Sequence, residues 1–253
     1  MSKIVSATVP ALPRVSRPSF GFWPYLVVGA VPWLFVATVF RIRSHTNMAT
    51  LVFGTQLVQL MVFMAFLLMS QRMINLTGGG TSLDKLSFRD QTKLGWAVLK
   101  RVLGVSVLVF VIGYLAGVHP FHLITLALGI DGIVFPWYGQ SNPAWNACVA
   151  MLAFLMVVEQ GLDRPPTLRS VARELGKRWL YILLGTIAVW LFLSGANALQ
   201  RMLTAALEPY YAASAGPFQR YFYTGYFLGT SYIRLWITVA ILTYALKASY
   251  RQP

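Results

Sequence analysis

The chain has 253 residues, of which 57% are hydrophobic and 11% are charged, and its mean hydropathy is +0.62. This composition excludes a soluble globular domain and is typical of an integral membrane protein. The formal net charge of +14 does not indicate nucleic-acid binding, because membrane orientation accounts for it and no nucleic-acid-binding motif is present. We therefore expect an all-α protein that crosses a membrane several times.

Residues 1–20 are basic and contain no acidic side chain, a composition that resembles a transit peptide. Three prolines, Pro10, Pro13 and Pro18, would break the amphipathic helix that import requires. The apolar run that starts at Phe22 is long for a signal peptide and lacks a small-residue cleavage site. We predict a cytoplasmic N-terminal tail, followed by a helix that is retained as a signal anchor.

A helix needs about 20 apolar residues to cross the roughly 30 Å hydrocarbon core of a bilayer. Six stretches come near or exceed that length, and we predict that they span the membrane: 22–40, 49–69, 102–118, 144–162, 179–196 and 221–246. They form one transmembrane domain over residues 21–247, and residues 248–253 form a cytoplasmic tail.

A seventh apolar stretch, 121–138, is interrupted by Gly129, Asp131, Gly132 and Pro136. Lys and Arg in short loops stay on the cytoplasmic side, so the basic residues decide whether this stretch spans. If it does not span, sixteen basic residues lie inside and four lie outside. The inner group is Lys3, Arg14, Arg17, Arg72, Lys85, Arg89, Lys93, Lys100, Arg101, Arg164, Arg169, Arg173, Lys177, Arg178, Lys247 and Arg251, and the outer group is Arg41, Arg43, Arg201 and Arg220. We predict six spans, both termini in the cytoplasm, and a re-entrant or interfacial outer segment at 121–138.

Basic connectors precede the third and fifth spans. Ser87 with Asp90 three residues later, and Thr167 after two prolines, are signals that start a helix. Cations lie beside an apolar stripe in both connectors, so we predict two amphipathic cytoplasmic helices near anionic headgroups. At an offset of 81 residues the connectors also match weakly, as in Gly95 with Gly176 and Gly104 with Gly185. The alternative is that these cations only orient the protein.

Arg234 is the main candidate for an intramembrane polar contact, because a cation at the centre of a span needs a partner. It could bind a substrate, an anion or a carboxylate of another subunit. It could also pair with Glu159, Asp131 or a carbonyl, or extend to the interface. Gly225 and Gly229 on the same span would permit close helix approach, so self-association through 221–246 is a further expectation.

Three more polar side chains lie in predicted spans. Gln56 and Gln59 could line a polar path or form interhelical hydrogen bonds, which is the commoner use. Glu159 could relay protons, although a carboxylate near Arg164 at the membrane interface is more ordinary. The single cysteine, Cys148, lies in a span, and we predict a buried structural thiol.

A polar cluster on the outer face is predicted from His119, His122 and Asp131, with His45 and Glu208 on the same side. The spacing of His119 and His122 is not that of a zinc motif, and Pro120 makes a helical pair doubtful. No predicted span contains a histidine, which disfavours haem or chlorophyll binding. We therefore predict no metal, no cofactor and no catalytic residue.

Three hypotheses about function remain open. The first is a non-catalytic accessory, assembly or scaffold subunit of a membrane complex, with membrane lipids and other membrane subunits as partners. The second is a small transporter or channel for a solute or lipid, favoured by Arg234 and the interrupted 121–138 segment. The third is a membrane enzyme that uses the outer histidines. We favour the first, as a multi-pass protein of a bacterial inner membrane.

Overall fold

A computed structural model of the chain describes residues 22–43, 48–76, 87–119, 123, 129–136, 142–161, 167–212 and 216–251. These residues form seven helices and contain no strand, which confirms the all-α prediction. The helices are α1 (Phe22–Arg43), α2 (Met48–Leu76), α3 (Phe88–Leu115), α5 (Asp131–Val134), α6 (Pro143–Gly161), α7 (Leu168–Ala212) and α8 (Pro217–Arg251).

Four helices are long and apolar enough to cross a membrane within the described residues, as expected of a membrane protein. The four stretches are Leu57–Ile74, Arg89–Leu115, Leu168–Tyr210 and Tyr221–Ser249. In α1 and α6 the apolar stretches are shorter, at Gly29–Arg41 and Pro143–Glu159. Each of the six predicted spans thus falls on a helix, and the total of six crossings stays a prediction.

The two predicted helix starts are confirmed by their hydrogen bonds. Before α3, the Ser87 hydroxyl accepts the N–H of Asp90 at 3.3 Å and donates to the Asp90 carboxylate at 2.7 Å. Before α7, Oγ1 of Thr167 accepts the N–H of Ser170 at 3.1 Å. Such side chains satisfy backbone N–H groups that have no partner inside a helix.

The two basic connectors end differently. The backbone of Arg178 is not helical (φ −130°, ψ 26°), and this kink separates residues 168–177 of α7 from the span that starts at Trp179. In α3, by contrast, the connector and the span belong to one helix. The matched glycines also differ, because a Cβ at Gly95 would meet Met64 whereas Gly176 has open space around it.

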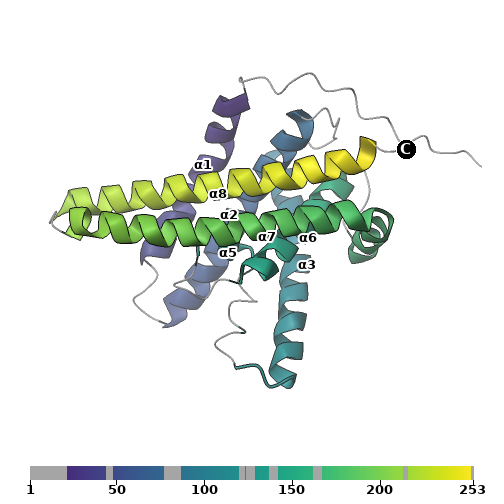
Figure 1. Cartoon of the computed structure of the whole chain (residues 1–253), viewed down its shortest axis with the longest axis horizontal. Helices are drawn as coiled ribbons and strands as arrows, with labels where there is room; N and C mark the ends of the chain where they lie inside the picture. The colour runs from purple at the N-terminus through teal and green to yellow at the C-terminus, as the bar shows by residue number, and fades with distance from the viewer. Residues whose placement is uncertain are drawn as a thin grey trace, which may run out of the picture.

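The longest helices, α7 and α8, lie side by side as an antiparallel hairpin along the long axis of the molecule (Figure 1). Close approach of these helices needs Gly185, since a Cβ there would lie 2.8 Å from Cβ of Ala245 and 3.1 Å from Cε of Met151. In the same view α3 runs at a steep angle to the hairpin and extends away from it.

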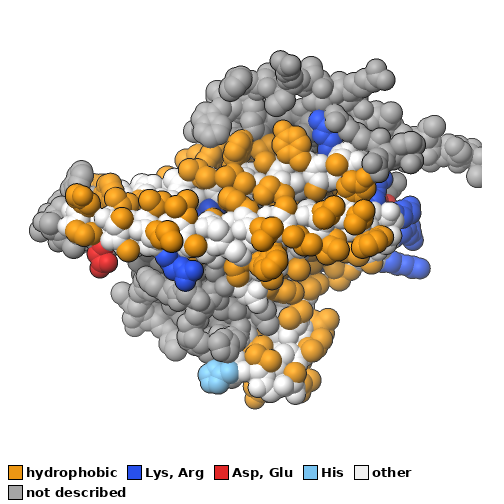
Figure 2. Space-filling model, in the orientation of Figure 1, with side chains coloured by type: hydrophobic (Ala, Val, Ile, Leu, Met, Phe, Trp, Pro, Cys, Tyr) orange, Lys and Arg blue, Asp and Glu red, His pale blue; other side chains and the backbone are white. Residues whose placement is uncertain are grey.

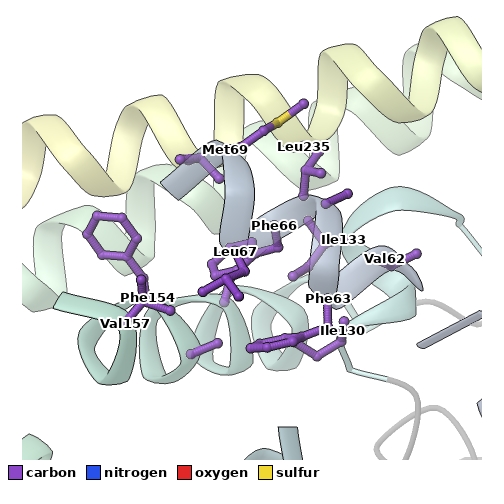
Figure 3. Close-up of a cluster of buried hydrophobic side chains, with 14 of the residues drawn as sticks. Val62, Phe63, Phe66, Leu67, Met69, Ile130, Ile133, Phe154, Val157 and Leu235 are labelled. Carbon is purple, nitrogen blue, oxygen red and sulfur yellow. The ribbon is translucent and has the colours of Figure 1, made fainter. Parts of the chain in front are cut away.

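The core is built around α2. The aromatic rings of Phe63 and Phe66 are fully buried and stack with centroids 6.2 Å apart. Ile133 from α5, Phe154 from α6 and Leu235 from α8 complete the apolar cluster around them (Figure 3). Burial of these large side chains fixes the position of α5 between α2, α6 and α8.

The prediction that Cys148 is a buried thiol is wrong, because its side chain is exposed on α6. Its neighbours Ala147, Val149 and Ala150 are buried, so α6 turns a packed stripe toward the core. Cys148 shares the opposite face with Ala144, four residues earlier, which is also exposed. In a uniformly apolar helix, residue type alone does not identify the buried face.

Candidate functional site

The interrupted segment of the chain lies in the interior at residues 130–135, all of which are buried. Within it, α5 is a helix of only four residues. Its close packing requires glycine at two positions, because a Cβ at Gly129 would collide with Trp145 and Val149, and one at Gly132 with Asn146. As expected, the irregular backbone of this segment is therefore covered by other parts of the protein. Whether the segment enters from the outer side stays a prediction.

Arg234 from α8 reaches the end of this short helix. The side chain is 3% exposed, and its Nε donates to the carbonyl of Ile133 at 3.1 Å. Longer bonds of 3.5 Å run from Nη2 to the carbonyl of Gly132 and from Nη1 to Oε1 of Gln200 in α7. The last carbonyls of a helix lack intrahelical partners, so the guanidinium satisfies groups that α5 cannot satisfy itself.

Arg41 from α1 holds the other end of α5. Its Nη2 lies 3.0 Å from Oδ2 of Asp131, which is fully buried in the first turn of the short helix. We name Arg41, Asp131, Gln200 and Arg234 the arginine clamp. It links α1, α5, α7 and α8, and its charged groups sum to one positive charge in a buried setting.

Of the partners weighed for Arg234 in the sequence, the structure contains the carbonyl contact. Among the described residues, Arg234 donates to Gln200 and to two backbone carbonyls, and neither Glu159 nor Asp131 accepts from it. Both carboxylates are buried, Glu159 on α6 and Asp131 on α5. The predicted partner Arg164 lies outside the described residues.

Buried polar atoms surround the clamp on the neighbouring helices. Nδ2 of Asn146 on α6 and the hydroxyls of Ser231 and Thr238 on α8 have no hydrogen-bond partner among the described residues. Gln59 on α2 is also buried, whereas the side chain of Gln56 lies outside the described part. The interior of the protein thus contains several buried polar side chains, although most of the buried side chains are apolar.

The predicted outer cluster is not brought together by the residues that the structure describes. His119 is exposed just beyond the end of α3, while Asp131 is buried against Arg41. His45 and His122 lie outside the described residues. Within the described ranges, no three side chains of His, Cys, Asp or Glu are grouped as metal ligands.

Sequence reasoning missed the pairing of Arg41 with Asp131 and the contact of Gln200 with Arg234. One signal was available for the first pair: Asp131 is the only acidic residue in the interrupted segment, and Arg41 was predicted on the same outer side. Comparison with protein-family models, curated proteins and solved structures found no match. The assignment of function therefore rests on the geometry of this chain.

Proposed function

We propose that this protein is a non-catalytic accessory, assembly or scaffold subunit of a membrane complex. The observation that carries the proposal is the hairpin end, which we define as residues 197–212 of α7 and residues 216–220 at the start of α8. This part of the hairpin lies beyond the predicted span of α7 and exposes large apolar side chains.

The hairpin is too long to end inside a bilayer. After the kink at Arg178, α7 continues to Ala212, which is about 51 Å at 1.5 Å per residue. The 35 residues of α8 extend about 52 Å by the same measure. Because the hydrocarbon core is roughly 30 Å thick, the hairpin end should reach the headgroup layer and the water beyond it.

Large apolar side chains cover this hairpin end. Met202 is 70% exposed, and Tyr210 is 76% exposed. Figure 2 shows orange side chains continuing to the left end of the hairpin. Large exposed apolar side chains on a soluble surface mark contact sites, and Met and aromatic residues are enriched in interfaces.

Hydrogen bonds between the helices hold the hairpin end in shape. The hydroxyl of Tyr226 lies 3.3 Å from Oγ1 of Thr204 and donates to the carbonyl of Gln200 at 3.4 Å. A surface that is already ordered loses less conformational entropy when a partner binds. The arginine clamp has a structural task as well, because its groups hold α5 in place. The ordered hairpin end and the arginine clamp both support a role as a scaffold subunit.

The same proposal includes a location and an orientation. The excess of basic residues on one side favours a bacterial inner membrane with both termini in the cytoplasm. The hairpin end and the segment near Gln140 would then face outward. A reporter inserted near Gln140 should be accessible from outside in intact cells, and a cytoplasmic signal would contradict the orientation.

Photo-cross-linking in native membranes tests the accessory role. A photoreactive amino acid at Met202 should give one product of defined size, heavier than this chain by the mass of a partner. Leu184, exposed on the same helix inside the predicted span, is the matched control and should give only lipid adducts. Equal products from both positions, or none from Met202, would contradict the proposal. A product of twice the chain mass would instead indicate self-association.

A small transporter or channel for a solute or lipid is the second candidate. It is favoured by α5, because short interrupted helices beside buried polar groups frame the substrate sites of many transporters. The net positive charge of the arginine clamp would suit an anion. Uptake of an anion by proteoliposomes, lost in Arg234→Gln and kept in the exposed control Arg201→Gln, would favour this candidate over the first.

A further inference from the structure

An open surface hollow of about 480 Å³ lies on α3, and no residue of the arginine clamp is among the described residues that line it. The described residues that line it are Lys93, Trp96, Ala97, Lys100 and Arg101. Lys93 is three residues before Trp96 and four before Ala97, and each of these two lies four residues before Lys100 or Arg101, so all five positions share one face of the helix. Three positive charges and one indole ring therefore meet around a single depression.

The side chains around the hollow are arranged by local contacts. Nζ of Lys100 lies 5.1 Å from the centre of the Trp96 ring, and Nη1 of Arg101 donates to the carbonyl of Ala97 at 2.7 Å. Lys93 is exposed and lies 3.7 Å from Asp90, a surface pair that contributes little binding energy. The guanidinium and both ammonium groups have donors left for an anion.

An apolar stripe continues from the hollow along the same helix face. Gly104 is exposed with open space beside it, and the exposed side chains of Val107, Leu108, Val111 and Leu115 follow on the same face of the helix. The third predicted span begins at residue 102, so the hollow lies at headgroup level and the stripe lies at the level of the acyl chains. Charge and apolar surface are thus ordered as they are in a phospholipid.

We propose that this face of α3 is a binding site for one anionic phospholipid, with the phosphate in the hollow and an acyl chain along the stripe. Arg101 and Lys100 bind the phosphate oxygens, because charge-assisted hydrogen bonds to phosphate are strong. Trp96 provides the amphipathic ring that is favoured at this depth of a membrane. Gly104 leaves room for the first part of the acyl chain. The site is independent of the proposed accessory role.

The test is a titration of the delipidated full-length protein with phosphatidylglycerol, followed by native mass spectrometry. In the double variant Lys100→Gln/Arg101→Gln, the first lipid should bind about 30-fold more weakly, since each cation near an anionic membrane surface contributes a factor of about 5. The matched control Arg173→Gln/Lys177→Gln removes two exposed charges from the second connector and should bind like the wild type. Equal losses in both double variants would overturn the proposal.

Three further measurements distinguish the lipid headgroup from other sources of phosphate and test the placement of the acyl chain. Inorganic phosphate in excess should not displace phosphatidylglycerol, and displacement would show that a free anion is the ligand. Phosphatidylcholine should bind much more weakly, and equal binding would overturn recognition by charge. Gly104→Leu fills the stripe without changing charge and should weaken lipid binding, whereas wild-type affinity would overturn the placement of the chain. An unchanged melting temperature in each variant confirms that the fold is intact.

Discussion

Two helices of nearly equal length, α2 with 29 residues and α3 with 28, have very different surroundings. In the described residues, 72% of the apolar window of α2 is buried inside the protein, against 22% for α3. Both are apolar enough to cross a membrane. Hydropathy therefore predicts that a helix can cross, whereas its neighbours decide whether it contacts protein or lipid.

The difference arises from where each helix packs. The side chains of α2 lie between α5, α6 and α8, so large residues such as Phe66 fill the interior. Among the described residues, α3 packs against the core through its earlier part, where Leu94, Val98, Leu99 and Val102 are buried. Beyond Ser106 its side chains are largely exposed, which suits a helix that meets acyl chains. We expect substitutions to have large effects in the interior and small ones on the outer half of α3.

Asp131→Asn should give the largest effect, because it removes the buried carboxylate that pairs with the partly buried guanidinium of Arg41. The free energy of unfolding should fall by about 4 kcal/mol, as is typical when one partner of a buried ion pair is removed. Asp90→Asn, at an exposed ion pair, is the control and should change the stability little. Denaturant unfolding in detergent measures both, and equal effects would contradict the clamp.

Phe66→Ala and Leu108→Ala compare the two helices directly. Phe66 is fully buried in α2, so its loss should leave a cavity and cost about 3 kcal/mol. Leu108 is 58% exposed on α3, and its truncation should cost under about 0.5 kcal/mol. Thermal unfolding of both variants in the same detergent checks the difference. Similar melting temperatures would show that the outer half of α3 is also packed against protein.

Arg234→Leu should lower the free energy of unfolding by about 2.5 kcal/mol, because two buried carbonyls of α5 lose their donor. The substitution should also reduce the recovery of any bound partner protein, because the contact between α5 and α8 helps to position the hairpin. Arg201→Leu, exposed on α7, is the matched control. Unchanged expression, stability and partner recovery in Arg234→Leu would dispose of the role assigned to this residue.

Gly185→Val should have a smaller effect, a loss of about 2 kcal/mol, because the added side chain separates α7 from Ala245 of α8. Gly104→Val is the control, since Gly104 has open space and a Cβ should fit there without strain. Unfolding by denaturant distinguishes the two. If both variants were equally stable, the close approach of α7 and α8 would not depend on glycine.

Much of the fold follows from the sequence because its signals are local. The apolar runs predicted the positions of the long helices that the structure describes. The caps Ser87 and Thr167 predicted the first residues of two of them. Gly129 and Pro136 correctly indicated that the seventh apolar stretch is not one regular helix. Each of these features depends on neighbours a few residues away, which a single sequence displays.

The candidate site was predicted less completely because its contacts are distant in the chain. Arg234 was identified as a cation that needs a partner, but Ile133 lies 101 positions away and offers only a backbone carbonyl. No side-chain pattern marks such an acceptor. The outward direction of Cys148 was missed for a related reason: α6 is mostly apolar, and its polar residues Asn146 and Glu159 are buried, so no hydrophobic periodicity marks its packed face.

Native mass spectrometry of the tagged protein, extracted in mild detergent, tests the proposed accessory role most directly. The wild type should retain another protein subunit in a fixed ratio. The double variant Met202→Asp/Tyr210→Asp should lose that subunit at an unchanged melting temperature, because charge would disrupt the exposed apolar surface of the hairpin end. A solitary monomer or homo-oligomer that holds a solute would contradict the accessory role and favour transport.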